Sequence, residues 1–133
     1  MTLEELGRHL EALGWSHRLH DPRTLRCDHA SSEGDLHVYV RLTDEWLVAS
    51  VVPFLRTRGD NSFELLRWLL RQNRDLYQAR FATDEDGDVV LSVELPTESL
   101  DASEIRLALE NLIRYAVQHR ATLRRAAGLE GGP

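Results

Sequence analysis

The side chains best suited to metal chemistry lie in one acidic stretch, ATDEDGDVVLSVELP, over residues 82–96. An EF-hand calcium loop has glycine at position six, ligands at positions one, three and five, and a bidentate glutamate at position twelve. With Gly87 at position six, Asp84 and Asp86 fall at positions three and five, but positions one and twelve are alanine and valine, which cannot ligate calcium. Because Asp-Gly between alternating apolar runs is a strong turn signal, we interpret the stretch as a β-hairpin.

A second set of candidate ligands lies near the N-terminus: His17, His20, Cys27 and His29. Their spacing, H-x2-H-x6-C-x-H, matches no established zinc arrangement, and we expect Cys27 and His29 to share a strand face that the other two do not. Surface or structural histidines are the favoured interpretation. A metal-binding or small-ligand sensory regulator that uses these residues is the alternative function that we carry forward.

Catalytic chemistry has no support in the sequence. An enzyme would need a nucleophile with a base, a paired acid and base, or a phosphate-binding glycine loop. No G-x-S-x-G, G-x-G-x-x-G or P-loop motif occurs. We expect His119, which falls in the apolar stripe of a C-terminal helix, to be a partly buried histidine bonded to a neighbour and not a catalytic base.

Composition indicates one globular domain, with 133 residues, 42% hydrophobic and 29% charged. We expect the domain to cover residues 1–127 and residues 128–133 to form a disordered tail. The net charge of −6 argues against a nucleic-acid backbone as the main partner. No apolar run is long enough to span a bilayer, no signal peptide is evident, and one cysteine cannot form an internal disulfide, so we expect a cytoplasmic protein.

The elements that position these residues are helices and strands with clear local signals. Thr2 and Glu5 form the capping box of a first helix that ends at Gly14, and Asp101 and Glu104 cap the last helix. The expected elements after the first helix are strands at about 23–29, 36–42 and 46–54, a helix from Asn61 or Ser62 to about Asp75, the hairpin ending at Pro96, and a helix from Asp101 to about Ala127. This order, α-β-β-β-α-β-β-α, defines an α+β fold.

Two of these elements carry apolar residues on more than one face. WLVASVVPF, residues 46–54, is apolar on both faces, which is typical of a central strand or an interface. The apolar side chains of the second helix cover about 220° of its circumference, roughly twice the ~100° of a surface helix. We expect the part centred on Leu65 and Trp68 to face away from the sheet, toward a second copy or toward a terminal helix of the same chain.

The segment from residue 63 to residue 119 resembles the YbjN-like family. The matching features are an apolar helix leading into N-x-x-L, then ARFATDEDGDVVLSVELP, then an acidic-capped helix that begins near Leu100. That family in turn resembles class I type III secretion chaperones, which are small, acidic, cytoplasmic α/β proteins that dimerise and hold an extended segment of another protein. The resemblance implies a twisted antiparallel sheet packed against helices, with no enzymatic activity and no cofactor.

These observations predict a non-enzymatic, chaperone-like or adaptor protein that acts as a homodimer and binds another cytoplasmic protein through an extended segment. We expect no direct contact with a membrane or with nucleic acid. Aromatic and arginine side chains are enriched at interfaces, so the candidates for partner binding are Tyr39, Arg41 and Trp46. The expected dimer interface is on the second helix and consists of Phe63, Leu65, Leu66, Trp68 and Leu69.

Overall fold

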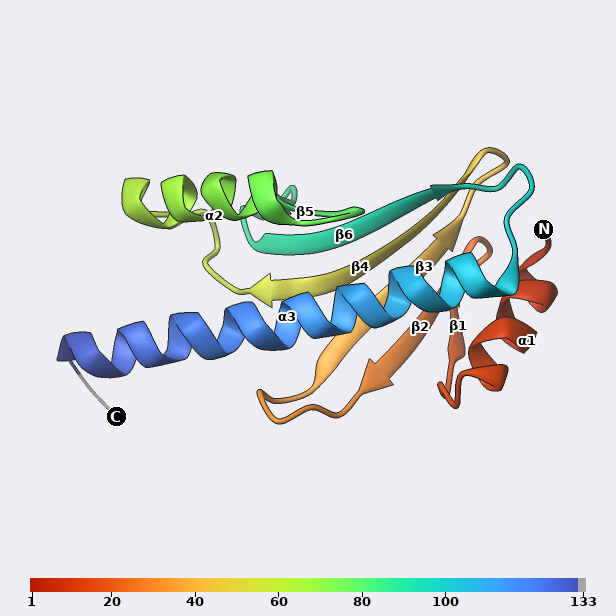
Figure 1. Cartoon of the computed structure of the whole chain (residues 1–133), viewed down its shortest axis with the longest axis horizontal. Helices are drawn as coiled ribbons and strands as arrows, with labels where there is room; N and C mark the ends of the chain where they lie inside the picture. Colours follow the sequence, from red (N-terminus) through yellow and green to blue (C-terminus); the bar gives the residue numbers. More distant parts are fainter. Residues whose placement is uncertain (132–133) are drawn as a thin grey trace.

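The computed structural model describes the backbone of residues 1–131 and the side chains of residues 1–125 (Figure 1). Its elements are α1 (Leu3–Ala12), β1 (Arg18–Asp21), β2 (Thr24–His29), β3 (Leu36–Leu42), β4 (Trp46–Leu55), α2 (Phe63–Asp75), β5 (Ala79–Thr83), β6 (Val89–Pro96) and α3 (Ala102–Gly131). The predicted α+β class is confirmed, and the elements follow the predicted order with one additional strand. Strand β1 was not predicted, because all four of its residues are exposed and carry no buried apolar pattern.

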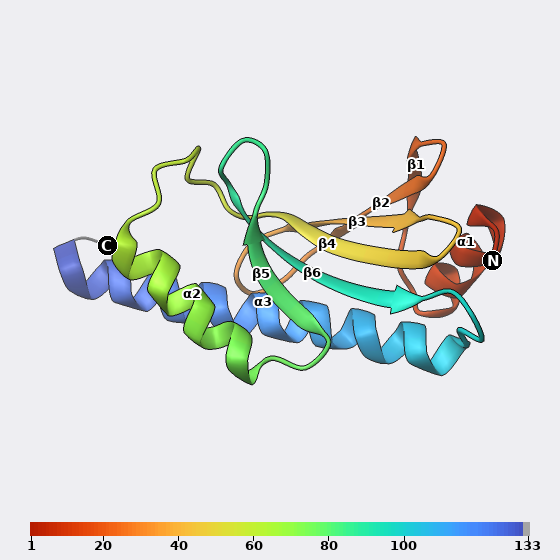
Figure 2. The ribbon, with the colours of Figure 1, turned by 90° about the horizontal axis from the view of Figure 1, so that it is seen from above.

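The six strands form one antiparallel sheet in the order β1-β2-β3-β4-β6-β5. Figure 2 shows α2 and α3 on the same side of the strands, with α3 running along the sheet, and α1 contacts β2. Strand β4 lies between β3 and β6, so the interpretation of residues 46–54 as a central strand is confirmed. The sheet therefore has two edges, β1 and β5, and one face that no helix of the described residues covers.

The core lies between the helices and the inner face of the sheet. Strand β3 alternates buried positions with half-buried or exposed ones, as its sequence predicts, since side chains of a strand point to opposite faces in turn. The fully buried side chains come from two helices and the sheet. They are Leu6 and Leu10 of α1, the inward residues of the central strands, and Ile105, Leu109 and Leu112 of α3. Burial of these side chains fixes which sheet face remains open.

Local capping defines where each helix begins. The Thr2 hydroxyl accepts a hydrogen bond from the backbone N–H of Glu5 at 3.2 Å, and Ser62 caps α2 in the same way. The Asp101 carboxylate accepts from the N–H of Glu104 at 2.8 Å, and this bond lowers the pKa of Asp101. Helix α3 continues to Gly131, past the end expected near Ala127, and residues 132–133 of the expected tail lie outside the described residues.

The acidic stretch forms the turn of the β5–β6 hairpin, as predicted. The Asp84 carboxylate accepts hydrogen bonds from the N–H groups of Asp86 and Asp88 at 2.9 and 3.0 Å. The Asp88 carboxylate is turned toward the loop before α2, where it accepts from two backbone N–H groups, of Thr57 at 2.8 Å and Arg58 at 2.7 Å. The hairpin turn thereby holds the loop that leads into α2.

Among the described residues, no helix combines the length and apolar character needed to cross a membrane.

Candidate protein-binding surfaces

The outer face of α2 exposes three large apolar side chains. Phe63 is 76% exposed, Leu70 is 71% exposed and Leu66 is 37% exposed. These residues are spaced at i, i+3 and i+7, so they lie on one face of the helix. Tyr77, which follows the helix, is 77% exposed. An apolar stripe of this kind is typical of a surface that another molecule covers.

The apolar arc of α2 around Trp68 packs within the chain and does not face a free surface. The Trp68 ring packs 5.6 Å from the ring of His119 on α3 and 6.3 Å from that of Phe81 on β5. Leu69 is 5% exposed, and Leu65 is half-buried against the core. The C-terminal helix thus covers Trp68 within the chain, which was one of the two alternatives. Of the five interface residues predicted, Phe63 and Leu66 are the exposed ones.

His119 has the structural role that its position predicted. Its Nδ1 lies 2.6 Å from the backbone oxygen of Tyr115, and its Nε2 lies 3.3 Å from Oε1 of Gln72 on α2. Its ring also packs edge-on against Phe81 at 5.3 Å. This histidine therefore joins α3 to α2 and β5.

The edge of the sheet at β5 is closed by a side chain of α2. The Asn73 amide donates to the backbone oxygen of Phe81 at 3.1 Å, and the Phe81 N–H donates to the Asn73 oxygen at 2.6 Å. These backbone groups are the ones that an added strand would need at this position. Beside them, between α2 and β5, is an apolar hollow of about 220 Å³ that Leu66, Leu69 and Leu70 help to line. No local signal in the sequence points to the pairing of Asn73 with Phe81.

The other edge, β1, is open. All four of its residues are exposed, and the side chain of Leu19 is 66% exposed. A groove of about 480 Å³ runs between β1 and α1, lined on the helix side by Leu3 and Gly7 and on the sheet side by Leu19 and Leu25. Glu4, Arg8, Glu11, His17 and Arg18 complete the lining, so the groove has both apolar and charged walls. An exposed edge strand beside such a groove can receive an extended peptide by main-chain pairing.

The uncovered face of the sheet carries the three predicted partner-binding residues. Arg41 and Trp46 are brought together at one end, where both line a hollow of about 340 Å³ with Arg23. Tyr39 lies apart from them on the same face. Its ring is in contact with the Arg26 guanidinium, 5.6 Å from the ring centre, and with the ring of His20 at 4.9 Å. Their role in binding stays a prediction.

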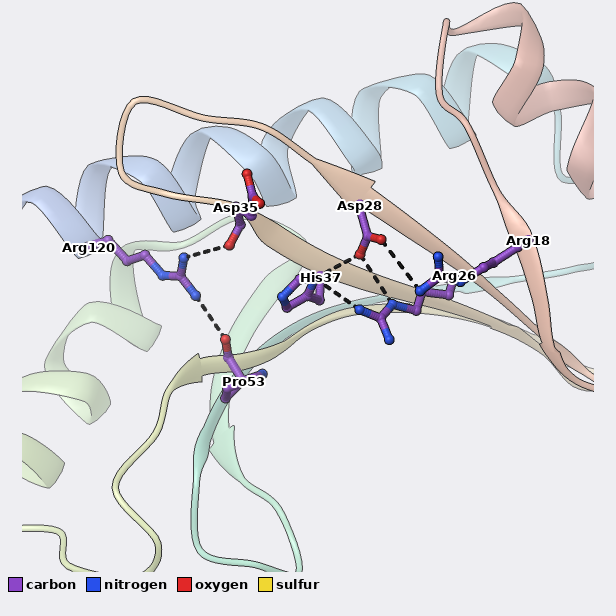
Figure 3. A network of polar contacts seen from close by, with 7 residues as sticks. All are labelled: Arg18, Arg26, Asp28, Asp35, His37, Pro53 and Arg120. Carbon is purple, nitrogen blue, oxygen red and sulfur yellow. Dashed lines mark hydrogen bonds and ion pairs between the residues drawn. The ribbon is translucent and has the colours of Figure 1, made fainter.

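A polar network next to Tyr39 ties β1, β2 and β3 together (Figure 3). The Asp28 carboxylate lies 2.7 Å from Nδ1 of His37, accepts from Nε of Arg26 at 3.2 Å, and pairs with Arg18 of β1 at 3.6 Å. The bond to His37, followed by the two arginines, lowers the pKa of Asp28. The open edge strand is therefore attached to its neighbour partly by charge.

The four candidate metal ligands near the N-terminus do not converge. Cys27 faces the core with 1% exposure, and burial raises the pKa of its thiol to about 11. His17 lies 3.3 Å from Glu11, His20 packs on Tyr39, and His29 packs on Trp15. Within the described residues, no three His, Cys, Asp or Glu side chains are grouped to hold a metal ion. These four side chains therefore do not form the metal cluster that a metal-binding sensor would need.

A six-stranded antiparallel sheet with three helices, in the order α-β-β-β-β-α-β-β-α, has the architecture of the type III secretion chaperones. The sequence agrees with this class, because the model of the Tir chaperone protein (CesT) family matches residues 26–120. The chain belongs to the Tir chaperone protein (CesT) family.

Solved structures with the same fold are similar over most of the chain. For E. coli YbjN the TM-score is 0.67 at 15% identity, over 92% of this chain and 94% of that one. For the ExsC–ExsE complex the TM-score is 0.60 at 20% identity, over 87% and 92%. For the Yersinia pestis type III secretion chaperone SycH in complex with a fragment of YscM2 it is 0.57 at 19%, over 86% and 96%. A comparison with curated proteins found no match.

Proposed function

We propose that this protein is a non-enzymatic, chaperone-like protein that pairs with a second copy through α2 and holds an extended segment of another protein. The observation that carries the proposal is the difference between the two sheet edges. At β5 a side chain of α2 bonds to the edge, and α2 itself exposes apolar side chains, whereas the β1 edge is free. The family supports the protein-binding role. So do the ExsC–ExsE and SycH–YscM2 structures, in which a similar fold is in complex with another protein.

The homodimer is proposed to form through Phe63, Leu66 and Leu70. A stripe on one helix is self-complementary about a two-fold axis, and closed two-fold pairing is the commonest way to cover such a patch. The hollow between α2 and β5 lies beside this stripe and offers a recess for the side chains of the second copy. Because Asn73 occupies the backbone groups of Phe81, we expect helix packing and not strand pairing to hold the dimer.

The partner segment is proposed to lie along β1. There the free backbone groups of the edge would provide affinity, and the groove between β1 and α1 would take apolar side chains of the segment. The hollow that Arg41 and Trp46 line lies at the turn between β3 and β4, and Arg23 of the β1–β2 turn also lines it. A segment that continues past Asp21 and the β1–β2 turn would reach these predicted contacts.

The test compares two exposed leucines. Leu19→Asp places a charge at the proposed binding edge, whereas Leu107→Asp, at a residue 52% exposed on α3, is the matched control. Proteins retained from the native cytoplasm by the wild type are identified by mass spectrometry, and binding of each is measured with purified components. We expect Leu19→Asp to weaken binding at least about tenfold, as loss of a central apolar contact does. Equal binding by both variants would show that the partner binds away from β1. A wild-type protein that retains no other protein would contradict the proposed function.

A further inference from the structure

Arg120 of α3 holds a positive charge against the end of β4 with no carboxylate of its own. Its guanidinium donates to three backbone oxygens. Nε donates to Phe54 at 3.0 Å, and Figure 3 shows the other two bonds, from Nη2 to Pro53 at 2.9 Å and from Nη1 to Asp35 at 3.2 Å. The group also lies 5.7 Å from the centre of the Phe54 ring. All three acceptors are uncharged backbone oxygens, so they orient the guanidinium, and the Glu33 carboxylate acts on its charge only at a distance, without a direct bond. An arginine has five N–H donors, so two remain after these three bonds.

Glu33 carries the carboxylate that lines the same hollow as Arg120, and it is already paired with another arginine. Arg124 binds both oxygens of Glu33, Nε to Oε1 at 2.9 Å and Nη2 to Oε2 at 2.8 Å, and the Glu33 side chain is only 8% exposed. Arg56 lines the same hollow. The lining thus contains three arginines and one glutamate, an excess of two positive charges, on a chain whose net charge is −6. Such an excess in a partly desolvated site attracts an anion.

The volume of the hollow and its apolar walls indicate which kind of anion would fit it. The hollow has a volume of about 460 Å³, and its other walls are apolar: Pro53, Phe54, Leu55 and Leu123. A fully hydrated ion such as phosphate would leave these walls without a contact. A carboxylate carried next to an apolar side chain would satisfy both parts, because the planar guanidinium matches a carboxylate and the leucines accept the apolar group.

We propose that this hollow is a second anchor point for the bound protein, which receives an acidic side chain flanked by apolar residues. The carboxylate is bound by Arg56 and by the two free N–H groups of Arg120, while the flanking side chain packs on Leu55 and Leu123. The source of the ligand rests on the proposed function. The anion site itself rests on the arginine arrangement alone.

The test uses a pair of isosteric peptides, acetyl-Leu-Glu-Leu-amide and acetyl-Leu-Gln-Leu-amide. Binding to the purified protein is followed by nuclear magnetic resonance, through the arginine Nε–H signals and the backbone signals of residues 53–56 and 120–124. We expect weak, saturable shifts with the acidic peptide and binding at least about tenfold weaker for the glutamine peptide, because a charge-assisted hydrogen bond is lost.

Arg56→Gln is the informative variant, because Arg56 is exposed and its replacement leaves the Arg120 bonds intact. We expect it to weaken binding of the acidic peptide about tenfold, while Arg106→Gln, exposed near the other end of α3, binds as the wild type does. Equal binding of the two peptides, an Arg56→Gln protein that binds like the wild type, or tighter binding of inorganic phosphate would each overturn the site. Peptide binding without any captured protein would support the anion site and overturn the proposed function.

Discussion

The two edges of the sheet are treated in opposite ways by the same chain. At β5 the side chain of Asn73 occupies the backbone groups of Phe81, and α2 lies alongside with an exposed apolar stripe. At β1 the edge residues are exposed, and a groove separates them from α1. A closed edge beneath an apolar helix suits packing against another helix, and a free edge suits strand addition. One small sheet can therefore support two kinds of contact without competition between them.

The largest effect is expected from Gly87→Ala, which should break the β5 side alone. Gly87 has a φ of 81°, and a Cβ there would lie 2.4 Å from the Cα of Gly59 in the loop before α2. Strain and the backbone clash together should lower the free energy of unfolding by about 3 kcal/mol. Hydrogen exchange should accelerate in α2 and β5 and stay unchanged in β1 and β2.

Gly34→Ala is the matched control for this change. Gly34 also has a positive φ, of 94°, but a Cβ there would have no neighbour within 4 Å. Only the backbone strain remains, so the loss should be about 1 kcal/mol. Equal losses in the two variants, measured by urea unfolding, would show that the contact between Gly87 and Gly59 contributes nothing.

The Asn73→Ala variant should open the closed edge. It removes two hydrogen bonds to the backbone of Phe81, and at about 1 kcal/mol each the loss of stability should be about 2 kcal/mol. The freed backbone groups should also raise the tendency to aggregate, as exposed edges do. Urea unfolding and light scattering measure the two effects. Arg71→Ala, exposed on the same helix, should show neither, and an Asn73→Ala protein as stable as the wild type would contradict the account.

The smallest effect concerns the attachment of the open edge and its pH dependence. Because His37 and two arginines lower the pKa of Asp28, the ionised carboxylate stabilises the folded state. That contribution is present above the usual aspartate pKa of about 4 and is lost as pH falls through the lower folded value. Asp28→Asn should therefore be less stable than the wild type near neutral pH, and the difference should shrink toward pH ~3. Urea unfolding measures the difference in free energy of unfolding between the two proteins. A difference that stays constant with pH would contradict this contribution of the Asp28 carboxylate.

The sequence predicts those parts of the fold that depend on neighbours along the chain. Caps at Thr2, Ser62 and Asp101 and the turn at Gly87 are local chemistry, and the structure has each of them. Strand β1 escaped prediction because it has no buried face, so its position depends on pairing with β2 and not on its own pattern.

The candidate site depends more on contacts between distant segments. Periodicity predicts that α2 is apolar over a wide arc, but not how the helix is rotated. That rotation is set by Phe81 and His119, which draw Trp68 inward and leave Phe63 and Leu70 exposed. The meeting of Arg120 with the end of β4 likewise joins residues far apart in the chain. The spacing of residues within one helix or strand does not indicate contacts of this kind between distant segments.

The central claim, that α2 joins two copies of the chain, is tested most directly by sedimentation velocity at micromolar concentrations. We expect the wild type to be a dimer. Leu70→Asp, which would bury a charge in the interface at a cost of ~3 kcal/mol, should dissociate it by more than a hundredfold in affinity. Leu107→Asp should remain a dimer. A monomeric wild type, or a dimer that is indifferent to Leu70→Asp, would contradict the account.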